Sequence, residues 1–278
     1  MTEISAELVR GLREATNVSM MECKRALVEA GGDKDKALRI LRERGMAIAA
    51  KKSSRTANQG VIASAIMDGG KAGSLVEVNC ETDFVARNDS FRVFVKTVAE
   101  KAAATDGSLV EPMKDVVTAK VAELGENILI RRNLRFVLQG TGLVASYIHL
   151  GGKVGVLLEV GCEKAETVAN PVFAELAKDI TLHIAACSPR YLDRKDVPAD
   201  VIKAEREIYA KQVQGKPANI IDKIVDGKMG KFYKDACLVD QGFVKDPETP
   251  VNKLFEAKGK ELSDKLAIRR FVRFQLGE

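Results

Sequence analysis

Side chains able to perform acid–base, nucleophilic or metal chemistry are scarce in this sequence. Its 278 residues include two histidines and five cysteines, and the cysteines are widely spaced with no C-x-x-C pair. That spacing predicts neither a zinc site nor a disulfide framework. No G-x-S-x-G, H-E-x-x-H or G-x-x-x-x-G-K-S/T motif occurs in the sequence, so the usual nucleophile, zinc and phosphate sites are missing. We therefore expect a protein that is not an enzyme and that holds neither a metal ion nor a cofactor.

The two histidines differ in their sequence surroundings. His183 lies in LAKDITLHIAAC, an apolar helical pattern, and this setting favours a core residue with satisfied hydrogen bonds over a metal ligand. His149 ends a predicted strand beside the turn HLGGK and is the better functional candidate, although a role in capping the turn fits equally well. The glycines and lysines of GGKAGS and GGKVGV have the wrong spacing for a phosphate loop, so we assign both segments to hairpin turns.

The most informative short segment is CETDFVARN, residues 80–88. It places an aromatic side chain, Phe84, directly after an aspartate, where a predicted strand ends and a helix is about to begin. Two interpretations are open at this point. The ring packs back onto its own helix, or it is exposed and acts as a wedge for a pocket on another protein.

Composition limits the class of protein. With 46% apolar residues the chain can bury one large core or two modest ones. Its net charge of +5 is not concentrated in basic stripes with interleaved aromatics, so we expect no direct nucleic-acid contact, and an acidic protein partner fits. No secretory leader and no apolar run near the roughly 20 residues of a membrane span is found. We therefore expect a cytoplasmic protein without membrane contact.

The first 48 residues predict a small bundle of three helices. Ser19 and Asp33 are N-cap residues for the second and third helices, and Gly45 is the expected end of the third. A bundle of this size is marginal alone, so we expect it to present a surface rather than to enclose a site. Met20 and Met21 lie in the first turn of the second helix, where flexible thioethers can adapt to a partner or can simply cap the core. The polar, basic segment 49–59 is a predicted linker.

The rest of the chain contains an internal repeat. Residues 60–91 align with residues 142–173, and 15 of the 32 positions are identical. Residues 112–138 align with residues 250–276, with 11 of 27 identical, including IRRNLRF against IRRFVRF. The two alignments have different offsets, so the second copy carries an insertion.

Each copy is a predicted β-β-α-α-β unit. Two β-branched runs joined by a Gly-Gly turn indicate a hairpin, two helical patterns follow, and a long strand closes the unit. The fold class is thus α+β. The insertion has two charged helical patterns on either side of Gly215, which favour a projecting helical hairpin. The expected domains are the bundle at 1–48, the linker at 49–59, the first copy at 60–139, and the second copy at 140–278 with its insertion at about 190–245.

Comparison of the copies favours the wedge interpretation of Phe84. The copies agree at strands, turns and helix starts but differ between Cys80 and Asn88, and Glu166 stands where the first copy has Phe84. The fold therefore does not demand an aromatic at this position. An exposed aromatic on a short loop between a strand and a helix is suited to binding a pocket on a partner.

The chain resembles the bacterial elongation factor Ts family from end to end. The resemblance is carried by LVRGLREATNVSMMECKRALVEAGGDKDKAL, VNCETDFVARN, SYIHLGGKVGVLLEV and GENILIRR. It implies a ubiquitin-associated-like (UBA-like) N-terminal bundle, a duplicated core and a helical hairpin through which a homodimer can form. It also implies the activity of a guanine-nucleotide exchange factor for the translational GTPase elongation factor Tu, which is the implied partner in its GDP-bound and nucleotide-free forms.

The resemblance also implies functional residues. In that family the TDFV segment is associated with displacing the magnesium ion of the partner, and its phenylalanine wedges between two helices of the GTPase domain. The matching residues here are Thr82, Asp83, Phe84 and Val85. The bundle is implied to contact the same domain, and the histidine of the second copy is implied to touch another domain of the partner. The matching residues are Arg10, Arg13, Met20, Met21 and His149.

The main alternative is an RNA- or ribosome-binding module without exchange activity. Such a module would bind nucleic acid in a salt-sensitive manner. The scattered basic charge argues against it.

Overall fold

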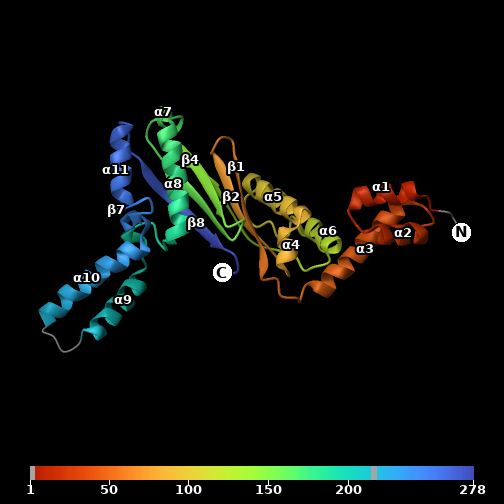
Figure 1. Ribbon diagram of the computed structural model, residues 1–278, viewed down its shortest axis with the longest axis horizontal. Coiled ribbons are helices and arrows are strands. Elements are labelled where there is room, and N and C mark those ends of the chain that lie inside the picture. Colours follow the sequence, from red (N-terminus) through yellow and green to blue (C-terminus); the bar gives the residue numbers. More distant parts are fainter. Residues whose placement is uncertain (1–3, 214–217) are drawn as a thin grey trace.

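The computed structural model describes residues 4–213 and 218–278. It is an α+β fold, which confirms the expected class. A helical bundle lies at one end, two three-stranded antiparallel sheets pack face to face in the centre, and a helical hairpin projects from the other end (Figure 1).

The bundle consists of α1 (Ala6–Thr16), α2 (Met20–Glu29) and α3 (Lys34–Lys52). Ser19 and Asp33 cap α2 and α3 as expected, because their side chains accept hydrogen bonds from backbone N–H groups of the first turn. The expected helix end at Gly45 is wrong. The helix runs on to Lys52 because Gly45 packs against α6 (Lys114–Leu124), where a Cβ added to Gly45 would lie only 3.3 Å from the Cβ of Ala122. The first four residues of the predicted linker are therefore helical.

Two sheet units follow the bundle. The first has the strand order β1-β2-β3 and the second has the order β4-β5-β8, with all neighbours antiparallel. The first unit consists of β1 (Gln59–Met67), β2 (Ala72–Cys80), α4 (Asp83–Arg87), α5 (Asp89–Ala104), α6 (Lys114–Leu124) and β3 (Leu129–Val137). The second consists of β4 (Gly142–His149), β5 (Val154–Gly161), α7 (Ala165–Val168), α8 (Pro171–Cys187), α11 (Val251–Glu261) and β8 (Ala267–Gln275).

Each unit contains one helix more than the sequence predicts. The expected order was β-β-α-α-β, but α4 and α7 are additional short helices between the second strand and the long helix. With five and four residues, α4 and α7 are too short to show a helical period. The segment around Phe84 is consequently the start of a helix and not a loop.

Each sheet packs one face against its own helices and the other against the second sheet. The shared core between the sheets contains Ile62 and Leu75 from the first unit and Val144 and Leu157 from the second. The Ile62 N–H donates to the Gly152 carbonyl and the Val144 N–H donates to the Gly70 carbonyl, each at 2.8 Å. Each unit thus donates one backbone hydrogen bond to the other unit across the interface.

Two buried carboxylates strengthen this interface. Glu77 and Glu159 are fully buried in the central strands β2 and β5. Glu77 pairs with Arg132 at 2.8 Å, and the guanidinium of Arg132 lies 4.1 Å from the ring centre of Phe274 in the other unit. The second unit repeats the arrangement, with Glu159, Arg270 and Phe136 in the same roles. A buried carboxylate needs such a partner because desolvation of an isolated charge is costly.

The insertion in the second unit projects from the body of the molecule (Figure 1). Its two long helices pack through a small core that includes Val197, Val225, Met229 and Phe232. The predicted turn around Gly215 lies outside the described residues. The elements of the insertion are the 3-10 turn η1 (Arg194–Asp196), α9 (Ala199–Gln212), α10 (Ala218–Ala236), the 3-10 turn η2 (Leu238–Asp240), β6 (Gly242–Phe243) and β7 (Asp246–Pro250).

Candidate functional site

The TDFV segment forms the first turn of α4. Thr82 is the N-cap residue, and its hydroxyl accepts a hydrogen bond from the Val85 N–H at 3.3 Å. Asp83 forms an ion pair with Arg87 one turn later, at 2.9 Å. Val85 is half-buried against the core of the first unit. Phe84 is 82% exposed, the largest exposed fraction among the large apolar side chains of the described residues, which confirms the expected exposure.

A single carboxylate holds the start of this turn. Glu126, in the loop between α6 and β3, accepts hydrogen bonds from the Glu81 N–H at 3.1 Å and the Thr82 N–H at 3.0 Å. The Thr82 hydroxyl donates to the other oxygen of Glu126 at 2.6 Å. Hydrogen bonds to a charged acceptor are about twice as strong as neutral ones. The backbone that carries Phe84 is therefore fixed although the ring itself is free.

Asn127, the residue after Glu126, forms a second set of hydrogen bonds that holds the same turn. The Asn127 N–H donates to the Glu81 carboxylate at 2.6 Å, and this bond is the main cause of the lowered pKa of Glu81. The side chain of Asn127 donates to the Arg55 carbonyl at 2.7 Å, which ties the segment before β1 to the same place. Cys80 is inert here, because burial raises the pKa of its thiol to about 12.

The second unit builds an equivalent turn without the aromatic. Asp264 accepts hydrogen bonds from the N–H groups of Glu163 and Lys164, each at 3.1 Å, and from the Thr167 hydroxyl at 2.5 Å. Glu166, which matches Phe84 in the first unit, is exposed on this turn. The two units thus share the carboxylate anchor and differ in the side chain that the turn presents.

The turn after β4 lies against the first unit near Phe84. Lys153, in this turn, donates to the side chain of Gln59 at the start of β1, at 3.3 Å. Arg92 of α5 donates to the Ala86 carbonyl of α4 at 3.3 Å, and its Nη2 lies 4.0 Å from the position of a Cβ on Gly151. Arg92 therefore bridges α4 and the turn, so both lie on one edge of the molecule.

His149 ends β4 at this edge, as the sequence predicts. Its side chain is exposed, and its Nδ1 lies 3.0 Å from the Tyr147 hydroxyl. Its carbonyl accepts hydrogen bonds from the N–H groups of Gly152 and Lys153, each at 3.1 Å. Turn closure is thus performed by the backbone of His149, which leaves the imidazole accessible.

The remaining predicted contact residues lie on the bundle, whose helices α1 and α2 lie apart from α4 along the long axis of the molecule (Figure 1). Arg10 and Arg13 are on α1, and Met20 and Met21 are on the first turn of α2; all four are exposed. The structure therefore brings His149 and Phe84 to one edge but leaves these four residues on a separate surface.

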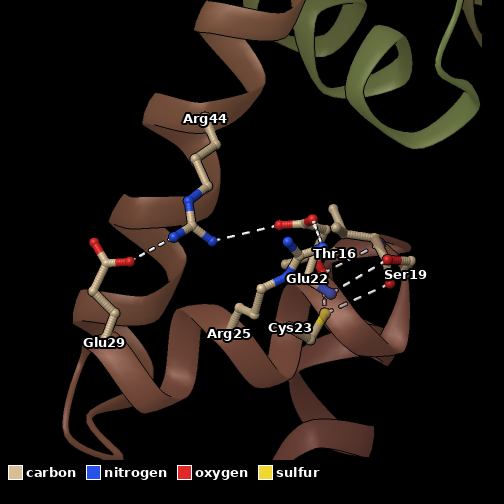
Figure 2. A network of polar contacts seen from close by, with 8 residues as sticks. Thr16, Ser19, Glu22, Cys23, Arg25, Glu29 and Arg44 are labelled. Carbon is tan, nitrogen blue, oxygen red and sulfur yellow. Dashed lines mark hydrogen bonds and ion pairs between the residues drawn. The ribbon is translucent and has the colours of Figure 1, made fainter.

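Polar contacts fix the orientation of α2 and hence of its methionines. The Ser19 hydroxyl accepts a hydrogen bond from the Glu22 N–H at 3.3 Å. Arg44 of α3 reaches Glu22 at 3.4 Å and also pairs with Glu29, so it joins both ends of α2 to α3 (Figure 2). Met20 and Met21 are consequently displayed on a rigid turn.

The other groups that could perform chemistry are structural. His183 is fully buried; its Nδ1 accepts a hydrogen bond from the Val244 N–H at 3.1 Å, and its Nε2 lies 2.9 Å from Gln241. This confirms the expected core role. Within residues 4–213 and 218–278 no group of three or more potential metal-ligating side chains occurs, and no helix has the length and apolar character to cross a membrane.

The sequence reasoning missed Glu126 and Asp264. Both follow a helix in a polar loop, where an acidic residue is unremarkable. The alignment of residues 112–138 with 250–276 does place the two carboxylates at matching positions, and that match was the available signal.

Comparisons with known proteins identify the relatives of this chain. A family model described as Elongation factor TS matches residues 81–278. The elongation factor Ts of Clostridium perfringens (strain SM101 / Type A) is 43% identical over 288 residues, covering 99% of this chain and 93% of the relative. The proteins of the same name from Trichlorobacter lovleyi and Nitratiruptor sp. are 42% and 43% identical, with the same coverage of both chains.

Proposed function

Because this chain belongs to the elongation factor Ts family, we propose that it is a cytoplasmic guanine-nucleotide exchange factor for elongation factor Tu. It releases GDP through protein contact alone and is not an enzyme. The observation that carries the mechanism is an almost fully exposed phenylalanine on an anchored helical turn. An exposed ring on a rigid support is suited to entering a groove, because little conformational entropy is lost on binding.

In this mechanism the four residues of the TDFV segment have different roles. Phe84 inserts between two helices of the GTPase domain and so disturbs the site of the bound magnesium ion. Thr82 caps the turn, and Asp83, paired with Arg87, sets the approach of the turn. Val85 seats the turn on the core of the first unit. Met20, Met21, Arg10 and Arg13 contact the same domain, and His149 contacts another domain of the partner.

The binding of the wedge and of GDP are coupled through one bistable element of the GTPase. The coupling is reciprocal: the factor by which the wedge lowers the affinity for GDP equals the factor by which GDP lowers the affinity for the wedge. Burying the Phe84 ring contributes about 2 to 3 kcal/mol, which corresponds to roughly 30- to 160-fold in affinity. Larger coupling requires the contacts of the bundle and of the His149 edge.

The proposal extends to the architecture. The two sheet units are copies of one ancestral unit, and the bundle is UBA-like. The hairpin of α9 and α10 serves self-association or a peripheral contact, for which Ile208 and Ile220 supply exposed apolar surface. We assign it no part in GDP release.

The decisive experiment measures release of a fluorescent GDP analogue from loaded elongation factor Tu. The unmodified chain should accelerate release, and Phe84→Ala should slow the catalysed rate at least tenfold. Because the side chain is exposed, the same change should alter the free energy of unfolding by less than about 0.5 kcal/mol. Val110→Ala is the matched control, since Val110 is 48% exposed and has no assigned role. An unchanged release rate with Phe84→Ala would refute the wedge.

A further inference from the structure

The turns after β1 and β4 have the same backbone conformation but different residues at one strained position. In the first unit the turn runs through Asp68, Gly69 and Gly70, with φ of 51°, 64° and 97°. In the second unit it runs through Leu150, Gly151 and Gly152, with φ of 49°, 66° and 102°. Aspartate and leucine therefore occupy the same left-handed position.

Leucine is poorly suited to this position. A left-handed backbone places Cβ close to the following carbonyl, and aspartate tolerates it far better than a bulky apolar residue does. Burial does not offset the strain, because the Leu150 side chain is 70% exposed. The first unit closes the same turn with Asp68, so the turn does not require leucine. A strained and exposed apolar residue of this kind points to a role outside folding.

Leu150 lies on the edge that carries Phe84. It is adjacent to Gly151, which faces Arg92, and Arg92 in turn donates to the backbone of α4. Arg92 and Lys153 are exposed on this edge, and neither forms an ion pair within the part of the chain that the structure describes. The edge therefore presents two exposed apolar side chains, Phe84 and Leu150, and two basic side chains, Arg92 and Lys153, whose charges no carboxylate of the described residues pairs.

We propose that Leu150 is a second apolar anchor of the exchange factor, and that it inserts into a separate apolar pocket, with an acidic rim, on the same GTPase that receives Phe84. This inference rests on the proposed function. The acidic rim follows from charge complementarity with Arg92 and Lys153. Two anchors on different elements, both held by backbone contacts, explain how a rigid edge can engage two sites of a partner at once.

The test uses two reciprocal substitutions. Leu150→Asn replaces leucine with a residue that accepts the left-handed conformation, so it should raise the urea midpoint of unfolding while weakening the affinity for nucleotide-free elongation factor Tu about tenfold. Asp68→Leu places the same strained leucine in the first unit. It should lower the urea midpoint and leave both affinity and GDP release unchanged. Opposite signs for stability and affinity separate an anchor from a structural residue.

Three outcomes would overturn the inference. Affinity could stay unchanged in Leu150→Asn, the urea midpoint could fall in that variant, or Asp68→Leu could weaken binding to the same extent. Phe84→Ala is measured in parallel to separate this inference from the proposed function. If Phe84→Ala slows GDP release and Leu150→Asn has no effect on affinity, only the second anchor is wrong. If Phe84→Ala has no effect either, the wedge mechanism itself is wrong.

Discussion

Glu126 should govern GDP release although it does not reach the surface that we assign to the partner. We predict that Glu126→Ala slows GDP release from elongation factor Tu at least tenfold. The substitution removes the acceptor for the Glu81 and Thr82 N–H groups and for the Thr82 hydroxyl. The turn that carries Phe84 then loses its fixed start, and the partner must order it on binding.

The magnitude follows from these three hydrogen bonds. Bonds to a charged acceptor contribute about 1.5 to 3 kcal/mol each, but water replaces part of each bond because Glu126 is half-exposed. We therefore expect the free energy of unfolding to fall by about 2 to 4 kcal/mol in total. Ordering a backbone residue costs about 1 to 2 kcal/mol, so ordering two residues on binding costs about 2 to 4 kcal/mol. Since each tenfold in rate is about 1.4 kcal/mol, a loss of tenfold or more is expected.

The second unit supplies the matched control. Asp264→Ala removes a comparable anchor, two backbone N–H bonds and one hydroxyl bond, from a turn that presents Glu166 instead of an aromatic. It also removes the bond that Asp264 accepts from the Lys265 N–H. Its stability loss should be similar, and its rate of GDP release should stay within about twofold of the unmodified chain. Stability is read from urea unfolding by far-ultraviolet circular dichroism, since the chain contains no tryptophan. Equal slowing of release by the two variants would show that global stability, and not the position of the turn, controls exchange.

Two further predictions concern His183 and the hairpin. Burial lowers the pKa of His183, partly opposed by its hydrogen bond to Gln241. The unfolded chain therefore binds a proton more readily than the folded chain, and stability should drop as pH falls below the ordinary histidine pKa of about 6.5. His183→Gln should flatten this drop in urea midpoints, and an equally steep drop in the variant would assign the effect to another group. Replacing residues 206–224 with a short glycine linker should leave most of the exchange activity, because the hairpin projects away from α4 (Figure 1); complete loss of exchange in a variant that still unfolds cooperatively would contradict its peripheral role.

The sequence by itself determined the local structure around the candidate site. Ser19 and Asp33 indicate helix starts because their side chains accept hydrogen bonds from the free N–H groups of the first turn. These hydrogen bonds involve only residues that are neighbours in the sequence. The Gly69–Gly70 and Gly151–Gly152 pairs indicate tight turns, because a residue without a Cβ readily adopts the positive φ that such turns require. Phe84 could be singled out without coordinates since Glu166 takes its place in an otherwise matching segment.

Only the tertiary structure decided how that site is held and what lies beside it. Glu126 bonds Thr82, which lies 44 positions away in the chain, and Arg92 lies against Gly151 in the turn after β4 of the second unit. No local sequence pattern encodes either contact. The helical start at Phe84 also depends on Glu126, because five residues are too few to sustain a helix through its own hydrogen bonds. The left-handed backbone of Leu150 is visible only in coordinates, since leucine predicts the opposite conformation. Local hydrogen bonds follow from neighbouring residues, whereas the Glu126 anchor arises only when distant segments of the first unit pack together.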